Sequence, residues 1–541
     1  MKSREVSIRI PRLQNVCPPG SPSLRLALVV LSIGAASHFM LYLDSVVDNL
    51  LPAALPFFKS MYETSDAAES AWEIMVSARI YGLAVGCFIS ILICQRCGRK
   101  LPILIGIGLD VVGVILTLLI TSVSSGVSLA TLGRMMNGVG QGIVQTVGSV
   151  MLVEIPPMKR RGTVLATLTV WACLGELGGL LMSLNHTLGN EKNWHLAMGV
   201  PLIFLLPALL IIIKAPESPR YLYIQNKDFE ARKALLYYQL PADARVSIDE
   251  MESETGPMID ENGNKKPTSM WKLSERINNG KFVRPLLIAM VVQSFVHLDD
   301  WLWISYSTPI FEKHGISTTQ AQYASLLMSF PQAIISFSLL GCFDKFDRRT
   351  LLIVPTCISI VLGILAIMTA SSGFYGISGG TILVIIASMD LSVAAVSGES
   401  AYAIVPELFL PDDKIAGTAI VGIVQNVFGG VITNILLTAV NKNGLSMVLI
   451  PFVVVNCSYV LITSSKLPET KDKSAQEVSV NFSSELPGIS VLEKLRSLAK
   501  SWIINTMTRD AIINFLVFII QCLIFAFFID FCVNVYQLFR K

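Results

Sequence analysis

Long apolar stretches constrain this chain more than any other feature of its sequence. A stretch of about 20 apolar residues can cross a bilayer core about 30 Å thick as a helix. Such stretches cover residues 24–43, 74–94, 101–121, 128–153, 162–184, 195–214, 285–308, 321–343, 351–371, 380–408, 415–438, 445–464 and 511–536. Charged residues make up 15% of the chain, against about 25% in a typical soluble domain. The chain is therefore predicted to be an all-α membrane protein.

Lysine and arginine gather at the N-terminus and at alternate joints between these stretches. The joints "CQRCGRK", "PPMKRRGT" and "FDKFDRRT" are examples. Because basic loops stay on the cytoplasmic side, the N-terminus is expected to be cytoplasmic. The polar start "MKSREVSIRIPRLQ" and a first apolar run of full span length argue against a cleaved signal peptide. Asn185 of "NHT" then falls in an external loop, where it is a candidate glycosylation site.

The cytoplasmic joints repeat at an interval of six stretches. "CQRCGRKLPILIG" is matched by "CFDKFDRRTLLIV", "EIPPMKRRGT" by "PELFLPDDKIAGT", and "APESPRYL" by "KLPETKDK". This pattern indicates two six-helix bundles in the same orientation, as in transporters with parallel repeats. The expected parts are a cytoplasmic N-terminus (1–23), an N-terminal bundle (24–214), a cytoplasmic linker (215–284), a C-terminal bundle (285–465), a cytoplasmic tail with an amphipathic segment (466–510) and an extra hydrophobic helix (511–541).

Acidic residues recur beside the basic ones at these joints. Topology signals require basic residues but not acids, so we expect ion pairs that close an inner gate across the two bundles. The alternative is that these charges set topology alone. The expected pairs are Glu154 with Arg161, Glu217 with Arg220, Asp344 with Arg348, and Glu407 with Lys414, and Arg99 is a further gating candidate.

Glycines inside the spans are predicted to serve helix packing. "GVGQG" follows no strand and lies within a span, which excludes a dinucleotide site. Gly82 with Gly86, and Gly138 with Gly142, have the small-xxx-small spacing that lets membrane helices approach closely. Outside the spans the sequence holds no nucleophile–base pair, metal-ligand set or phosphate loop. We therefore expect no enzyme activity, cofactor or metal, and no nucleic-acid partner.

Six motifs in one order resemble the sugar-porter family of the major facilitator superfamily. They are "GRMMNGVGQG…EIPPMKRRG", "APESPRYL", "STPIFEKHGI", "DKFDRRTLL", "PELF" and "LPETK", and the resemblance covers about residues 24–471. It implies twelve core helices, alternating access and a pocket lined by helices 5, 7, 8, 10 and 11. It also implies transport of a small polar solute, with a sugar favoured. Transport of a cationic or other charged metabolite, and non-transporting nutrient sensing, remain alternatives.

The residues that would line this pocket depart from the family pattern. Thr169 stands at a family glutamine, Gln293 and Ser294 stand at a glutamine pair, and Tyr402 stands at a tryptophan. The stretch "HLDD" adds acids to an apolar helix, where acids tend to line wet cavities. The expected substrate-binding residues are Thr169, Glu176, Gln293, His297, Asp299, Asp300, Trp301, Tyr306, Glu399, Tyr402, Gln425 and Asn426.

Asp44 and Arg134 both fall in the outer half of their predicted helices. The family resemblance places a coupling aspartate and arginine at these positions in its proton-linked members. A carboxylate that pairs with an arginine in one state and takes up a proton in another can couple proton movement to transport. A static ion pair is the alternative. The amphipathic tail segment is expected to lie on the membrane surface. The stretch 511–536 is long enough to span the membrane, and a membrane-buried hairpin or a helix packed beside the bundle is the alternative. The plasma membrane is the expected location.

Overall fold

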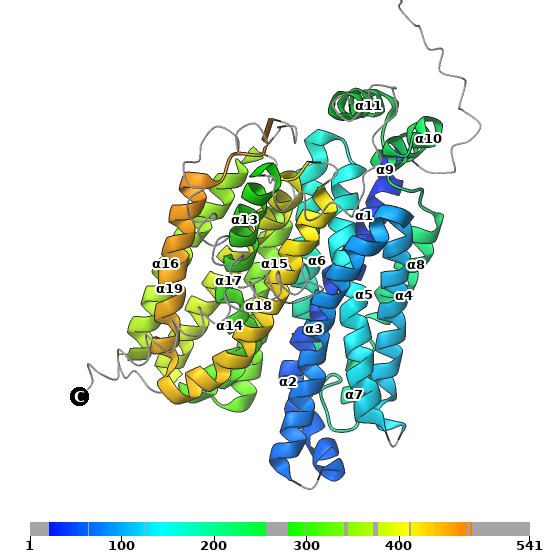
Figure 1. Cartoon of the computed structure of the whole chain (residues 1–541). Coiled ribbons are helices and arrows are strands. Elements are labelled where there is room, and N and C mark those ends of the chain that lie inside the picture. Colours follow the sequence, from blue (N-terminus) through cyan, green and yellow to red (C-terminus); the bar gives the residue numbers. More distant parts are fainter. Residues whose placement is uncertain are drawn as a thin grey trace, which may run out of the picture.

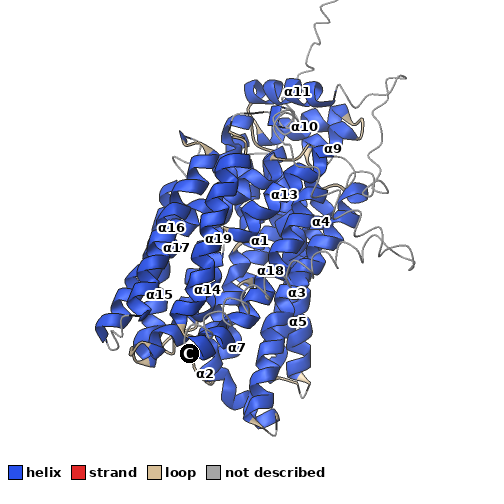
Figure 2. Cartoon of the chain, turned by 60° about the vertical axis from the view of Figure 1, so that its left-hand side comes forward, coloured by secondary structure: helices blue, strands red, loops and turns tan. Residues whose placement is uncertain are grey.

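The computed structural model describes residues 21–62, 64–123, 125–255, 280–296, 298–339, 345–371, 377–410, 413–471, 473 and 477–478. All of the elements in these residues are helices (Figure 2). This confirms the all-α prediction. The expected helix over 511–536 and the amphipathic tail segment lie outside the described residues.

The helices form two halves that stand side by side in Figure 1. The first half, blue to cyan, contains α1 (Pro22–Ser37), η2 (Phe39–Leu41), α2 (Tyr42–Met61), α3 (Ser65–Cys97), α4 (Lys100–Leu118), η3 (Leu119–Thr121), α5 (Gly126–Glu154), η4 (Met158–Arg160), α6 (Arg161–Met182), α7 (Trp194–Ala197) and α8 (Leu202–Lys214). The second half, green to orange, contains α13 (Gly280–Phe295), α14 (Leu298–Lys313), α15 (Thr318–Leu339), α16 (Arg348–Ser371), α17 (Ile377–Glu407), α18 (Lys414–Asn443) and α19 (Leu445–Lys466).

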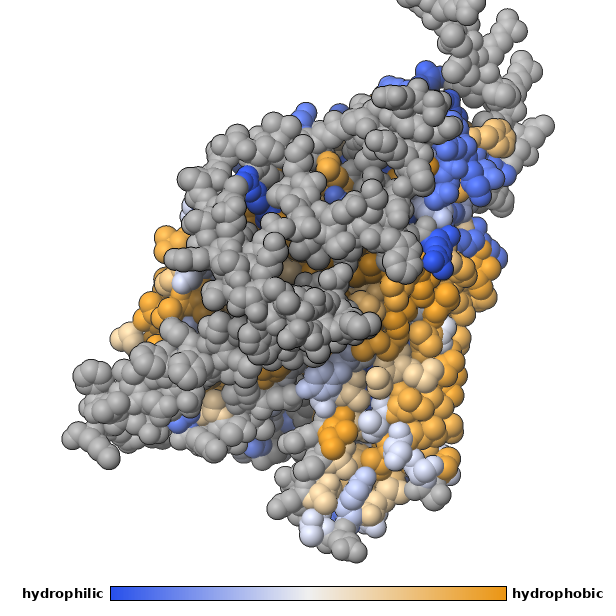
Figure 3. Space-filling view, in the orientation of Figure 1, coloured by the Kyte–Doolittle hydropathy of each residue, from blue (hydrophilic) through white to orange (hydrophobic). Residues whose placement is uncertain are grey.

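Three short linker helices cover one end of the molecule, at the top of Figure 1. They are α9 (Pro219–Ile224), α10 (Asp228–Tyr238) and α11 (Pro241–Thr255). Figure 3 shows hydrophilic surface at this end and apolar surface below it. Ile203 and Leu210 of α8 are more than half exposed on the outside. Within the described residues, nine helical stretches are long and apolar enough to cross a membrane.

The first long helix of each half is interrupted. α1 ends at Ser37 and α2 begins at Tyr42, while α13 ends at Phe295 and α14 begins at Leu298. A break inside a membrane leaves backbone carbonyls that need donors from the protein or from water. At the first break, polar side chains of α3 and α5 supply them: Arg79 Nη2 donates to Met40 O (2.6 Å), Gln141 Nε2 to Ser37 O (2.9 Å) and Arg134 Nη1 to Leu43 O (3.3 Å).

Glycines allow α3 and α5 to touch backbone to backbone. A Cβ atom on Gly138 would collide with the Arg79 carbonyl, and one on Gly82 would collide with the Met135 carbonyl. Gly86 and Gly142 meet opposing carbonyls in the same way. The predicted small-xxx-small packing is confirmed, and it places Arg79 of α3 directly against α5.

The two halves end in matching caps at the linker end. Glu217 accepts hydrogen bonds from the backbone amides of Arg99 (2.9 Å) and Lys100 (3.1 Å) at the start of α4. Glu469 accepts from the amides of Arg348 (3.0 Å) and Arg349 (3.1 Å) at the start of α16. A carboxylate at a helix N-terminus satisfies free amides and the helix dipole together. The repeat of "PES" and "PET" in the sequence is thus a repeat of one capping device.

Candidate functional site

The halves meet along a seam of polar contacts between spanning helices. α6 packs against α15 and α17, and α3 packs against α18. Ser329 Oγ of α15 donates to Glu176 Oε1 of α6 at 2.9 Å. About one turn earlier on α6 and two turns later on α15, Cys173 Sγ lies 3.3 Å from Ser336 Oγ. These contacts are buried, so they connect the halves inside the bundle.

The seam continues on the other helices of each half. The rings of His38 and Tyr402 meet edge to face, with centroids 4.9 Å apart. His38 lies at the break between α1 and α2, and Tyr402 lies on α17. Asn426 Nδ2 of α18 approaches Cys87 Sγ of α3 at 3.7 Å. The predicted residues Glu176, Tyr402 and Asn426 therefore each contact the opposite half.

Several buried polar atoms of α6, α13 and α15 have no hydrogen-bond partner among the described residues. Buried hydroxyls and amides are normally paired, so each such atom is a candidate contact for water or solute. Gln293 Nε2 donates a hydrogen bond to Gln425 Oε1 at 3.2 Å, which leaves the amide oxygen of Gln293. The buried atoms without a partner among the described residues are Thr169 Oγ1 on α6, Gln293 Oε1 and Ser294 Oγ on α13, and Gln332 Oε1 on α15.

The aromatic candidates have distinct surroundings. Trp301 lies against the α18 backbone, where its ring occupies the space a Cβ on Gly429 would need. Tyr306 has non-helical backbone angles (φ −140°, ψ 19°) and marks a kink within α14. Trp303 is buried and donates from Nε1 to Asp390 Oδ2 at 3.0 Å, so it packs the second half. His297 and the side chains of Asp299, Asp300 and Glu399 lie outside the described residues.

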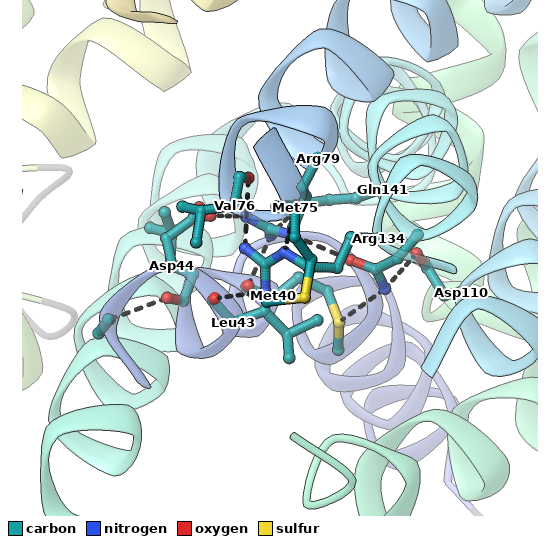
Figure 4. A network of polar contacts seen from close by, with 12 residues as sticks. Met40, Leu43, Asp44, Met75, Val76, Arg79, Asp110, Arg134 and Gln141 are labelled. Carbon is teal, nitrogen blue, oxygen red and sulfur yellow. Dashed lines mark hydrogen bonds and ion pairs between the residues drawn. The ribbon is translucent and has the colours of Figure 1, made fainter. Parts of the chain in front are cut away.

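Asp44 has a different partner from the one expected. Its carboxylate forms an ion pair with the guanidinium of Arg79 on α3 (Figure 4). The Arg134 guanidinium instead donates to backbone carbonyls, from Nε to Met75 O at 3.0 Å and from Nη1 to Leu43 O at 3.3 Å. The expected Asp44–Arg134 ion pair is therefore wrong in its partner. Arg134 holds the broken first helix, a backbone role that sequence spacing does not reveal.

Two expected gate pairs are also corrected. Glu154 pairs with Arg99 (3.1 Å), not with Arg161, and so closes a contact within the first half. Glu217 caps α4 instead of pairing with Arg220. Glu407 accepts a hydrogen bond from Thr470 Oγ1 at 2.7 Å. Asp344 lies outside the described residues.

Arg161 reaches the linker helix α11. It donates from Nη1 and Nη2 to the two carboxylate oxygens of Glu250 at 2.8 and 2.9 Å, and Arg220 adds a contact at 3.5 Å. Burial would raise the pKa of Glu250, but the two arginines outweigh it and the pKa is lowered. Arg161 and Lys414 act electrostatically on both Glu250 and Glu407. This joins α6, the linker and the second half in one charged cluster.

Arg79, Asp110 and Gln332 are candidate site residues that sequence reasoning missed. Arg79 and Asp110 are fully buried in the first half. Each is a lone charge inside an apolar stretch, which is a functional signal in a membrane helix. Gln332 carries a weaker signal, because an amide on a spanning helix is common at helix contacts.

A comparison with protein families gives the chain its class. The family described as "Sugar (and other) transporter" matches residues 30–482. The chain belongs to this family. It is therefore an integral multi-pass membrane protein of a family of transporters, as the motifs predicted.

Curated relatives and solved structures share this assignment. The facilitated glucose transporter member 2 of Sus scrofa is 25% identical over 76% of this chain and 77% of its own length. The galactose-proton symporter of Escherichia coli is 23% identical over 80% of this chain and 90% of its own. The proton:xylose symporter XylE bound to 6-bromo-6-deoxy-D-glucose has a TM-score of 0.68 at 17% identity, covering 84% of this chain and 100% of that one. It shows the same fold.

Proposed function

We propose that this protein carries a sugar across the membrane by alternating access between its two halves. Membership of the transporter family supports the process, and relatives named as glucose and galactose transporters support the substrate class. The single observation that carries the proposal is the seam between α6 and α15, where the buried Thr169 hydroxyl and the Gln332 amide oxygen have no partner among the described residues. Gln293 and Ser294 of α13 add two such oxygens within the second half. Neutral hydrogen-bonding groups of this kind suit a polyhydroxy solute.

The charges around the seam support proton coupling as part of this proposal. Asp44 is partly exposed and ion-paired inside the membrane, which is the arrangement a proton-linked carboxylate needs. The basic joints lie at the linker end, which supports a cytoplasmic N-terminus by the positive-inside rule. Asn185 is exposed beyond the opposite end of α6, which supports glycosylation outside. We propose the plasma membrane as the location.

Uptake by proteoliposomes tests the proposal. Labelled hexoses and pentoses should enter the vesicles in a saturable manner, faster with an inward proton gradient. Thr169→Val removes one hydroxyl without changing side-chain shape. Since one hydrogen bond contributes about 0.5–1.5 kcal/mol, the KM should rise about two- to tenfold.

Thr131→Val is the matched control, because the Thr131 hydroxyl bonds to a carbonyl of its own helix, Val127 O at 2.8 Å. Uptake of sugars unchanged by Thr169→Val would contradict the assigned site. Absence of sugar uptake together with uptake of an organic cation would replace the substrate class, and binding without uptake would indicate a sensor.

A further inference from the structure

A buried polar cluster joins two carboxyl groups through one arginine in the first half. We call Asp44, Arg79, Asp110, Asn137 and Gln141 the Arg79 cluster (Figure 4). Arg79 is fully buried. Its guanidinium contacts the Asp44 carboxylate and the Gln141 side-chain oxygen, and Nε donates to Asn137 Oδ1 at 3.0 Å. The cation is thus held from α2 and α5 together.

Asn137 passes this contact on to the second carboxyl. While its Oδ1 accepts from Arg79, its Nδ2 donates to Asp110 Oδ1 at 3.0 Å. Asp110 lies ten residues into α4, about 15 Å along the helix axis from Lys100. It is 0% exposed, and its Oδ2 has no hydrogen-bond partner among the described residues. The backbone amide of Gln141 is the other polar group near this carboxyl.

The two carboxyls differ in access. The Asp44 side chain is 28% exposed, whereas that of Asp110 is sealed between α4 and α5. Among the described residues, Arg79 is the charged group that acts on Asp110. The helices packed on α2 are α3, which carries Arg79, α6, which carries Glu176, α7, which carries His195, and α14, which carries Asp299 and Asp300.

An ionised carboxylate without an ion pair is expensive inside a protein, at several kcal/mol. In the described conformation the direct ion pair of Arg79 is with Asp44, and Asp110 receives one side-chain hydrogen bond. We propose that Asp110 is a second proton-binding site, linked to Asp44 through Arg79, so that one of the two carboxyls is ionised at a time.

Asp110 therefore holds its proton while Asp44 is ionised. When Asp44 takes up a proton from water, Arg79 loses its direct counter-charge, and Asp110 releases its own proton to water in a conformation that opens this carboxyl. Two carboxyls coupled in this way titrate as a pair. The inference rests on the proposed function in assigning the linked protons to transport, but the linkage itself exists without transport.

Infrared spectroscopy of the full-length protein in liposomes tests the linkage independently of any sugar uptake. The carbonyl band of a protonated carboxylic acid should be present at neutral pH and absent in Asp110→Asn. In Asp44→Asn, that band should fall to half intensity at a pH at least about one unit lower than in the parent chain, because Arg79 then favours the Asp110 carboxylate. Asp390→Asn is the matched control, since Asp390 is a buried carboxyl of α17 bonded to Trp303 and Ser359 in the other half. It should leave the band that Asp110→Asn removes, and the midpoint of that band, unchanged.

A band unaffected by Asp110→Asn, or a midpoint unaffected by Asp44→Asn, would overturn the proposal. Should Asp110→Asn fail to fold, Asn137→Ala replaces it, because loss of the hydrogen bond to Oδ1 should shift the same band. An unshifted band in that variant would also overturn the proposal. Failure of sugar uptake with intact linkage would refute the proposed function and leave this inference standing.

Discussion

At the residue scale, the charges inside the bundle differ by what surrounds them. Asp390 is held by Trp303 and Ser359 and packs the second half. Glu176 accepts from Ser329 across the seam. Asp44 pairs with Arg79, and Asp110 is linked to the same arginine through Asn137. The first environment holds helices of the second half together, whereas under the proposed mechanism the other two change when the halves move or a proton binds.

Glycine positions at the α3–α5 contact give a prediction at this scale. Gly138→Ala should lower stability by about 1–3 kcal/mol, because its Cβ would collide with the Arg79 carbonyl and overpacking of this kind is costly. The measurement is thermal unfolding of the purified protein in detergent. Gly108→Ala is the control, since nothing lies within 4 Å of its Cβ position. Equal unfolding temperatures for the two variants would contradict the packing account.

Sequence reasoning identified intramembrane charges at this scale but not their partners. The family resemblance and the depth of Asp44 in its helix marked it as functional and placed it near Arg134. Which arginine it pairs with depends on how α3 and α5 are rotated about their axes. That rotation is fixed by glycine contacts between the two backbones, which a single sequence does not specify.

At the element scale, the repeated joints act as helix caps. Glu217 and Glu469 hold the first amides of α4 and α16 in the same geometry. The repeat was readable from sequence because both copies keep a glutamate after a proline. The partner expected for Glu217, Arg220, was wrong, since the expected ion pair took account of charge and not of the free amides at a helix start.

Removal of one cap should loosen one helix start. Glu217→Ala should speed hydrogen exchange of the Arg99 and Lys100 amides about fivefold, because an N-cap contributes about 1 kcal/mol. Hydrogen exchange with mass spectrometry measures this. Glu191→Ala, at an exposed loop position, should leave the same amides unchanged. Unaltered exchange in Glu217→Ala would show that water replaces the cap without loss.

At the scale of the whole molecule, twelve core helices in two halves follow from the apolar periodicity and the repeated joints. The seam between the halves was less predictable. Its residues come from helices far apart in the sequence, and the oxygens on Thr169 and Gln332 are identified by having no partner in the part of the chain that the structure describes. Local sequence patterns predict the membrane-spanning helices, whereas the site depends on how the two halves face each other.

The linker helix α11 gives a prediction with a pH dependence. Glu250 has a lowered pKa in the folded protein, so its contribution is present above the ordinary carboxyl pKa of about 4.3 and is lost as pH falls through the lowered value. Glu250→Gln should remove this contribution of the carboxylate to stability at neutral pH. Because charged hydrogen bonds contribute about 1.5–3 kcal/mol, the α11 amides should exchange at least about tenfold faster.

Hydrogen exchange at neutral and acidic pH measures both effects. Glu252→Gln is the control, since its contact with Arg232 is exposed and spans 3.9 Å. If the parent chain released α11 already at neutral pH, or if Glu250→Gln matched Glu252→Gln, the Arg161–Glu250 contact would not be holding the linker.

The backbone contact between α3 and α5 has a consequence for the energetics of the conformational cycle. Helices joined by glycine at several positions resist sliding, so α3 and α5 should move as one body. Under the proposed alternating access, the free-energy difference between outward and inward states then depends mainly on the few seam contacts. Such differences are a few kcal/mol, comparable to two or three hydrogen bonds. Single substitutions at the seam can therefore invert the populations of the two states while leaving the fold intact.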